Sequence, residues 1–238
     1  MKRLPIYLLF VLMLFSVIPA AAQENVRVKC NNFTMNVPSA NARCYQIEEN
    51  IPLAEDASPA DFVNAQIAST SIFFTDYENI SSEIEPQATF YLIDDMTKTS
   101  FGLLDVALRL SDDVTNISSE SAKIVDLYRD TSFMPYQNKE RVINVLPEFL
   151  SFENGSGIRT VTGFDDSVQA SGSVSNLYYS FQGISSDGRY YISAVFPLMS
   201  VSLNGQSASN ADWTRVDGAD FQPSLKELDY YIRSIVIE

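Results

Sequence analysis

The stretch YYSFQGISSDGRYYISAVFP, residues 178–197, is the densest in aromatic side chains, and its alternating positions form two different faces. The Asp-Gly pair in its middle, Asp187 and Gly188, favours a two-residue type I′ turn, because Gly adopts a positive φ freely. That turn sets a register in which one face of the hairpin is apolar, with opposing pairs Tyr179–Phe196, Phe181–Ala194 and Gly183–Ile192. We therefore predict a β-hairpin and give Asp187 and Gly188 a structural role in its turn, not a role in a site.

Other segments show the same period of two residues, which is typical of strands. The predicted strands are residues 32–36, 43–51, 69–77, 88–94, 141–152 and 158–164. Between the last two lies ENGSG, residues 153–157, which predicts a glycine-containing hairpin turn. A phosphate-binding loop is the alternative, but no Lys follows and a strand comes next, so the sequence context contradicts it.

Two regions show helical spacing instead. Apolar residues recur every three or four positions between residues 100 and 130, which predicts one or two helices. Near the end of the chain, Leu225, Leu228, Ile232 and Ile235 form one stripe behind Pro223, which suits a first helical position. We predict an amphipathic helix there, packed against the sheet and ending the domain.

These elements define an α+β fold class, with an antiparallel β-sheet of hairpins packed against helices. Residues 23–238 contain no Pro/Gly/Ser-rich linker and no internal repeat, so we predict a single domain of about 215 residues. The apolar fraction of 46% is ample for a core.

The first 22 residues have the pattern of a secretory signal peptide. Lys2 and Arg3 precede the apolar residues 4–18, and Ala20, Ala21 and Ala22 follow Pro19. An uncleaved membrane anchor is the alternative, but a bilayer span needs roughly 20 apolar residues. We expect cleavage after Ala22 and a secreted or extracytoplasmic product with no membrane span after cleavage.

The charge of the chain disfavours one class of partner. The net charge is −14, and residues 1–22 hold two of the 16 basic residues and none of the 30 acidic ones, so cleavage would make it −16. Such a surface repels phosphate backbones. We therefore expect no nucleic-acid binding, and attribute the acidity to solubility outside the cell.

Cys30 and Cys44 are the only cysteines, and both would enter an oxidising compartment. We predict that they form a structural disulfide, which in the chain-entropy model stabilises the fold by about 3 kcal/mol. Two reduced thiols or a redox pair are the alternatives. The wide spacing lacks the Cys-X-X-Cys pattern that lowers a thiol pKa.

The chain has no histidine, which removes imidazole-dependent triads and the commonest zinc sites. Carboxylates are in surplus, and their pairs are Asp94–Asp95, Asp112–Asp113, Asp165–Asp166 and Asp217–Asp220. Such pairs can bind calcium or hydrolyse glycosides, but no calcium-loop motif is present, and solvated loops and helix caps are the simpler interpretation. We assign no catalytic, metal or cofactor-binding residue and predict no cofactor.

Trp213 and the glycosylation sequons are two further candidates. Trp213, in a polar late segment, suits partial burial better than sugar stacking. The sequons at Asn32, Asn79, Asn116 and Asn154 matter only in a eukaryotic secretory pathway.

Three segments together resemble a group of uncharacterised exported bacterial proteins whose arrangement is similar to PsbP-like α/β/α sandwiches. They are FENGSGIRTVTGF, YYSFQGISSDGRYYISAVFP and LKELDYYIRSI, and the resemblance is best over residues 140–238 and weaker over 32–95. It implies an antiparallel sheet with helices on its faces and an accessory or binding role, and it implies no reaction. No binding residue of PsbP itself has a counterpart here.

The sequence therefore favours an exported non-enzymatic binding or accessory domain. Its expected partner is an extracellular or envelope protein or a glycan. A carboxylate-dependent glycan hydrolase is one alternative, which requires two carboxyl groups facing one cleft. A calcium-stabilised extracellular module is the other.

Overall fold

The fold is seen in a computed structural model. It describes residues 25–37, 42–48, 67–75, 77, 80, 82–96, 141–164, 167–168, 176–200, 202–203, 206–207 and 210–238. The predicted signal peptide and the predicted helices of residues 100–130 lie outside these ranges. Within them, no helix has the length and apolarity that a membrane crossing requires.

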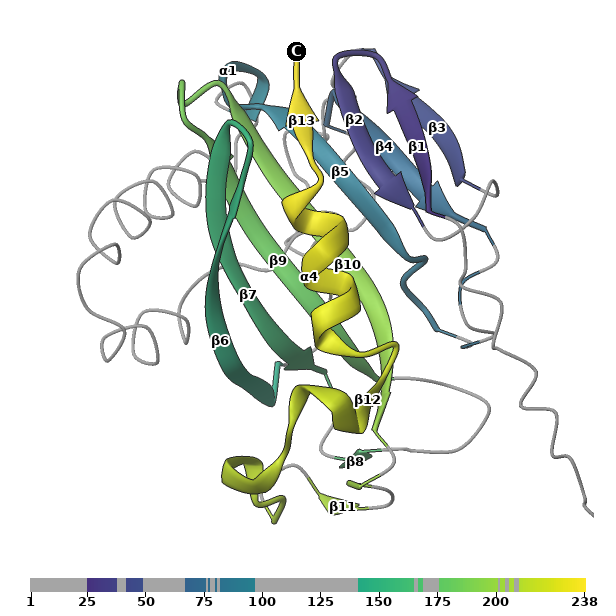
Figure 1. Cartoon of the computed structure of the whole chain (residues 1–238), viewed down its shortest axis with the longest axis vertical. Coiled ribbons are helices and arrows are strands. Elements are labelled where there is room, and N and C mark those ends of the chain that lie inside the picture. Colours follow the sequence, from purple (N-terminus) through teal and green to yellow (C-terminus); the bar gives the residue numbers. More distant parts are fainter. Residues whose placement is uncertain are drawn as a thin grey trace, which may run out of the picture.

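The largest element is an antiparallel eight-stranded sheet (Figure 1). In spatial order its strands are β3 (Ala42–Ile47), β4 (Ser69–Phe74), β5 (Gln87–Leu92), β10 (Tyr190–Ser200), β9 (Leu177–Ser185), β7 (Gly155–Gly163) and β6 (Ile143–Phe152), with β12 (Phe221–Gln222) paired to the end of β10. Five of the six predicted strand segments fall on strands of this sheet.

Smaller elements complete the described part. A three-stranded sheet contains β1 (Val26–Cys30), β2 (Phe33–Val37) and β13 (Val236–Ile237), and β8 (Ser167–Val168) pairs with β11 (Gln206–Ser207). The helices are α1 (Ile93–Met96), α4 (Leu225–Arg233) and the 3₁₀ turns η3 (Trp213–Arg215) and η4 (Gly218–Asp220). The described part is therefore mostly antiparallel sheet with few helices, of α+β or mainly β class.

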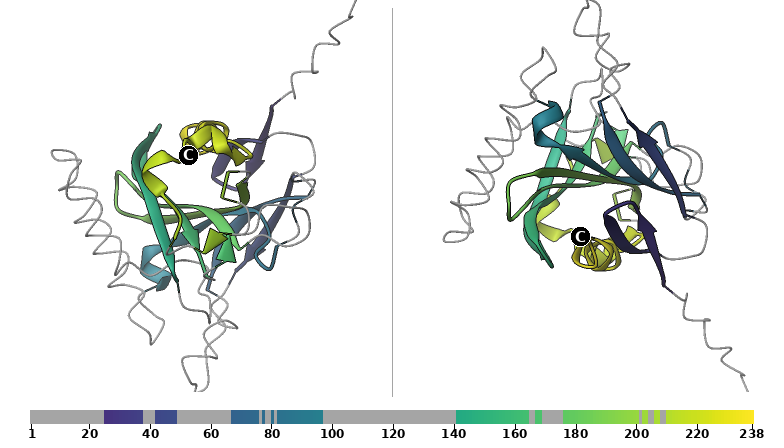
Figure 2. Two further views of the ribbon diagram at one scale, coloured as in Figure 1. Left: turned by 90° about the horizontal axis from the view of Figure 1, so that it is seen from below. Right: turned by 90° about the horizontal axis from the view of Figure 1, so that it is seen from above.

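Helix α4 and the three-stranded sheet lie on the same side of the large sheet (Figure 2). The main hydrophobic cluster joins these layers, because it includes Met35 of β2, Phe181 and Phe196 of the large sheet, and Leu228 and Ile232 of α4. All five residues are fully buried, with an exposed fraction of 0%. The apolar face of the large sheet is thus covered by one helix and a small sheet, and not by helices alone.

The β9–β10 hairpin has the predicted register, with Tyr179 opposite Phe196 and Phe181 opposite Ala194. The predicted type I′ turn is wrong, because Gly188 has φ 70° while Asp187 is not among the residues with positive φ. Instead Gly188 N–H donates to the Ser185 carbonyl over 2.8 Å, which makes a turn one residue earlier. The observed loop is longer than the predicted two-residue turn, but it is centred at the same place, between Asp187 and Gly188. The register of the two strands is therefore unchanged.

Polar side chains stabilise this loop. The amide of Arg189 donates to Asp187 Oδ1 at 3.0 Å, and the amide of Tyr190 donates to Ser185 Oγ at 2.9 Å. The Ser185 hydroxyl also donates to Asp187 and is the main cause of the lowered pKa of that carboxyl. Asp187 is thus a turn residue whose carboxylate replaces missing backbone partners.

The β6–β7 hairpin differs from the expected glycine turn. Phe152 pairs directly with Gly155, so Glu153 and Asn154 make the turn and both glycines lie in β7. A Cβ built on Gly157 would lie 2.2 Å from the Gln182 carbonyl oxygen of the adjacent strand. These glycines allow close approach to a neighbouring strand and to aromatic rings, and they do not supply the turn.

Helix α4 begins at Leu225, two residues later than Pro223 predicts. Ser224 is its N-cap and accepts a hydrogen bond from the amide of Glu227 at 3.3 Å, so Pro223 lies before the helix. The chain does not end in this helix. Ile235 is buried beyond its last residue, and β13 then pairs with β2.

Two cross-links attach the small sheet to the rest of the molecule. The predicted disulfide joins Cys30 of β1 to Cys44 of β3, with a Cα–Cα distance of 5.7 Å that is normal for such bridges. Asn154 in the β6–β7 turn bonds the backbone of Ile237 in both directions, accepting from its amide at 3.1 Å and donating to its carbonyl. The C-terminal strand is therefore fixed to both sheets.

Candidate functional site

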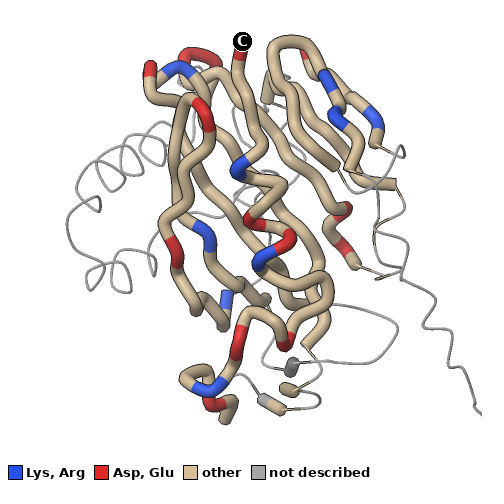
Figure 3. The backbone as a smooth tube through the Cα atoms, viewed as in Figure 1, with Lys and Arg blue, Asp and Glu red and all other residues tan. Residues whose placement is uncertain are grey.

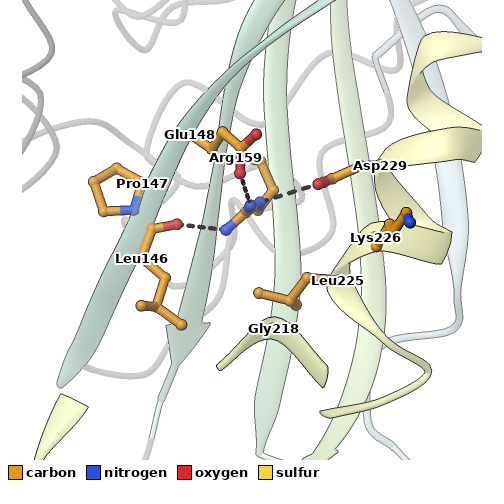
Figure 4. Close-up of a pocket in the computed structure, with 8 residues that line it drawn as sticks. All are labelled: Leu146, Pro147, Glu148, Arg159, Gly218, Leu225, Lys226 and Asp229. Carbon is orange, nitrogen blue, oxygen red and sulfur yellow. Dashed lines mark hydrogen bonds and ion pairs between the residues drawn. The ribbon is translucent and has the colours of Figure 1, made fainter. Parts of the chain in front are cut away.

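The described part contains a pocket of ≈ 440 Å³ between the first half of α4, η4 and strands β6 and β7. Figure 4 shows the side chains that line it, which come from segments far apart in the sequence. They are Leu146, Pro147, Glu148, Arg159, Gly218, Leu225, Lys226 and Asp229. One wall is apolar, and the charged groups gather at the other.

A β-bulge in β6 forms one side of the pocket. The register with β7 shifts between Val145 and Glu148, and Leu146 within the shift has φ 53°. A left-handed conformation costs a non-glycine residue roughly 1–2 kcal/mol. The bulge turns the Leu146 carbonyl toward Arg159, whose Nη1 donates to it over 2.6 Å. Local strain is thus coupled to the position of a charged side chain.

Arg159 is the central residue of the pocket, with a side chain only 6% exposed. Its position in β7 places it opposite Phe181, on the apolar face of the sheet. Nε donates to Asp229 Oδ1 at 3.3 Å, and Nη2 donates to Glu148 Oε2. With the bond to Leu146, three of the five guanidinium N–H groups have partners in the described part, so two do not.

Asp229 joins the helix to the sheet. Its Oδ1 accepts from Arg159 and also from the hydroxyl of Tyr179 at 2.9 Å. Burial raises the pKa of Tyr179 well above its usual value, and the neighbouring Asp229 carboxylate raises it further. Tyr179 is therefore a permanent hydrogen-bond donor at neutral pH and not a proton acceptor.

Glu148 lies at the mouth of the pocket, half exposed at 49%. Its Oε2 accepts from Arg159, and its Oε1 lies 4.0 Å from Nη2 of Arg233. Glu148 and Asp229 thus line one pocket, as glycoside hydrolysis would require. However, the Arg159 guanidinium bonds to both carboxylates and lies between them, where a hydrolase needs substrate and water.

The residues singled out by the sequence lie elsewhere. Cys30 and Cys44 form the disulfide, and Asp187 and Gly188 lie in the β9–β10 loop; none of them lines this pocket. Trp213 in η3 is partly buried against the main cluster, as predicted.

The structure divides the carboxylate pairs. Asp217 and Asp220 form a capping box on η4, since Asp217 Oδ1 accepts from the amide of Ala219 at 2.9 Å and Asp220 Oδ2 accepts from the amide of Asp217 at 2.7 Å. Asp94 and Asp95 lie in α1, and residues 112–113 and 165–166 are outside the described ranges. Among described residues, no three Asp, Glu or Cys side chains gather as metal ligands.

The described sequons differ in accessibility. Asn32 is exposed in the β1–β2 turn, whereas the amide group of Asn154 is bonded to Ile237. The other two sequons, at Asn79 and Asn116, lie outside the described ranges.

No prediction from the sequence included Arg159, Glu148 or Asp229. The sequence did contain a signal for them. Arg159 is two positions before Val161 in the same strand, so both side chains point to the core face. Asp229 interrupts the apolar stripe of α4 between Leu225 and Ile232. Two opposite charges, each inside an apolar pattern, indicate a buried ion pair.

Comparisons of the chain with protein-family models, curated proteins and solved structures find no match.

Proposed function

We propose that the protein is an exported non-enzymatic binding or accessory domain whose ligand occupies the pocket beneath α4. The observation that carries this proposal is Arg159, a buried cation held at a strained bulge with two N–H groups left over. Burying a charged side chain and straining a backbone both cost stability. Such costs are typical of sites that position a group for a ligand.

The lining of the pocket defines the kind of ligand. The unused N–H groups of Arg159 and the exposed Lys226 are donors, which suit an oxygen acceptor such as a carboxylate or carbonyl. Leu146, Pro147 and Leu225 offer an apolar wall next to them. A ligand with an oxygen acceptor joined to an apolar part fits both sides.

Thermal unfolding with matched small probes tests this proposal. Pentanoate and pentanamide share an apolar part and carry oxygen acceptors, whereas pentylammonium has the same chain and no acceptor. At about 50 mM, a probe with a Kd near 5 mM stabilises the folded state by roughly 1.4 kcal/mol. We expect the two acceptor-bearing probes to raise Tm and pentylammonium to leave it unchanged.

Lys226→Ala should reduce the effect of pentanoate, and Lys29→Ala, an exposed lysine remote from the pocket, is the matched control. An equal Tm increase with pentylammonium, or no increase with any probe, would contradict the proposal.

A carboxylate-dependent glycan hydrolase is the second candidate, because Glu148 and Asp229 line the same pocket. It predicts release of reducing sugar from a polysaccharide panel, with activity abolished in both Glu148→Gln and Asp229→Asn. No turnover in the wild type, with retained probe binding, favours the binding domain.

Export and fold family complete the proposal. Sequence patterns alone support the PsbP-like sandwich and the signal peptide of residues 1–22. The Cys30–Cys44 disulfide supports an oxidising compartment. The mass of the secreted product tests cleavage, since a chain beginning at Gln23 is expected. Calcium stabilisation is tested by Tm with calcium and with chelator, and an unchanged Tm would exclude the calcium-stabilised module.

A further inference from the structure

A second pocket, of ≈ 190 Å³, shares no residue with the one beneath α4. It lies where the β1–β2 turn meets the end of β3, the start of β4, the end of β5 and the start of β10. At ~30 Å³ per water, it has room for about six waters, close to the size of one pyranose ring.

Two side-chain amides form its polar rim. Asn31, in the left-handed conformation at φ 53°, donates from Nδ2 to Gln46 Oε1 at 2.9 Å and to Thr70 Oγ1 at 3.3 Å. Asn31 Oδ1 and Gln46 Nε2 have no partner in the described part of the chain. An acceptor and a donor side by side match a sugar hydroxyl, which donates one hydrogen bond and accepts others.

Tyr190 supplies a third polar group. The residue is only 8% exposed, yet its hydroxyl makes no hydrogen bond to a described residue. This oxygen is not among the fully buried unpaired atoms of the described part, so solvent or a ligand can reach it and complete its hydrogen bonds. Next to it, the rings of Phe33 and Phe90 stack with centroids 4.0 Å apart and provide an apolar floor for C–H groups.

The charges around the pocket exclude other ligand classes. Glu48 and Asp95 line it, and none of the described lining residues is Lys or Arg, so an anion would be repelled. A metal ion would find two carboxylates, and the described residues gather no group of three acidic or thiol ligands. The guanidinium of Arg189 lies 5.5 Å from the centre of the Tyr190 ring, but Arg189 does not line the pocket. The lining itself, of amides, carboxylates, a tyrosine hydroxyl and aromatic rings, suits an uncharged polyol.

We propose that this pocket binds one sugar unit of an uncharged glycan. Gln46, Asn31 and Tyr190 contact its hydroxyls, and the Phe33–Phe90 pair supports its apolar face. The proposal concerns a separate site and does not depend on a ligand beneath α4.

Titration calorimetry tests it on the oxidised, disulfide-bonded protein. The probes are maltotriose, cellotriose and chitotriose as neutral glycans, trigalacturonate as an anionic one, and calcium chloride. We expect at least one neutral trisaccharide to bind with a Kd near or below about 1 mM, and trigalacturonate not to bind.

The variants are Gln46→Ala and Tyr190→Phe, each of which removes one hydrogen-bonding group and should weaken binding about threefold to tenfold. Tyr45→Phe is the matched control, because Tyr45 is 53% exposed and precedes Gln46 on the opposite side of the same strand. Circular dichroism confirms that each variant is folded. Binding of calcium alone, binding unchanged by both variants, or no neutral glycan bound at about 10 mM would overturn the proposal.

Discussion

The two faces of the β9–β10 hairpin are buried to the same degree but by different chemistry. On the face toward α4 lie Tyr179, Phe181 and Phe196, each 0% exposed. On the other face Gln182 and Ser193 are 6% and 1% exposed. Tyr178 and Val195 also lie on this second face, in a small hydrophobic cluster. Alternation along these strands therefore separates a wholly apolar face from one that mixes polar and apolar residues, and it does not separate inside from outside.

The polar face is stabilised by side-chain hydrogen bonds that cross strands. Gln182 Nε2 donates to Ser193 Oγ at 3.2 Å, and the Tyr191 hydroxyl donates to Gln182 Oε1. Further along the sheet, Ser71 and Thr89 bond at 2.9 Å. Buried polar groups are tolerated when they are hydrogen-bonded. The stability of this face should therefore depend on its hydrogen-bond partners, and that of the apolar face on the volume of its side chains.

High pH should produce the largest effect, and it acts on both faces. Burial raises the pKa of Tyr91 to about 12, and raises that of Tyr191 and Tyr179 too. Above pH 10 these residues stay protonated in the folded state and ionise in the unfolded state, so the unfolded state binds fewer protons and stability falls as pH rises. Each tyrosine removes about 1.4 kcal/mol per pH unit between pH 10 and 12.

Urea unfolding at pH 8 to 12, with tyrosinate absorbance as a second signal, checks this window. Tyr191→Phe should lessen the slope by one tyrosine. Ionisation of all tyrosines at pH 10 in the folded protein would contradict the burial of these side chains.

Loss of volume on the apolar face comes next. Phe181→Ala removes a ring that is 0% exposed and contacts Phe152, and should cost about 3–5 kcal/mol of unfolding free energy. Tyr45→Ala removes a ring that is 53% exposed and should change stability by about 0.5 kcal/mol or less. Urea midpoints compare the two, and equal losses would show that the apolar face is not the principal core.

Arg159 is the exception on the apolar face, and its replacement tests whether the charge stabilises the fold. Arg159→Leu leaves the Tyr179 hydroxyl as the remaining hydrogen-bond donor to Asp229 among the described residues. The Asp229 side chain is 13% exposed, so this change should cost about 2–4 kcal/mol of unfolding free energy. The double variant Arg159→Leu with Asp229→Leu should recover most of that loss, because no unpaired charge remains. Recovery would support a binding role for the pair over a stabilising one.

How far the sequence predicts this molecule depends on the range of the interactions. The β9–β10 register follows from neighbouring residues, since period two and the Asp-Gly pair act within 20 positions. The disulfide follows because the chain has only two cysteines. The turn type was predicted wrongly. The Ser185 and Asp187 side chains form hydrogen bonds in the loop that the turn preference of an Asp-Gly pair does not take into account.

The candidate site could not be predicted from short stretches of sequence, because its residues are far apart in the chain. Arg159 and Asp229 are 70 positions apart, and the Leu146 carbonyl at the bulge bonds to the same Arg159 side chain. In the second pocket, Asn31 bonds to Gln46, which is 15 positions away. Tyr190 also lines this pocket, although its strand is distant in the sequence. Strand β13 was missed because two residues give no periodicity, and their pairing with β2 is tertiary.

The smallest effect should appear on the polar face, where a single hydrogen bond is removed. Thr89 Oγ1 donates to Gln87 Oε1 at 3.1 Å, so Ser71 donates to Thr89 and Ser71→Ala deletes that donor at a cost of about 0.5–1.5 kcal/mol. Thr89→Val added to Ser71→Ala should cost less than the sum of the single changes, because the acceptor left unpaired by the first is removed by the second. A double-variant cycle in urea measures this coupling. Strict additivity would mean that Ser71 and Thr89 are each satisfied by other groups, and the difference between the two faces would then be one of composition and not of bonding.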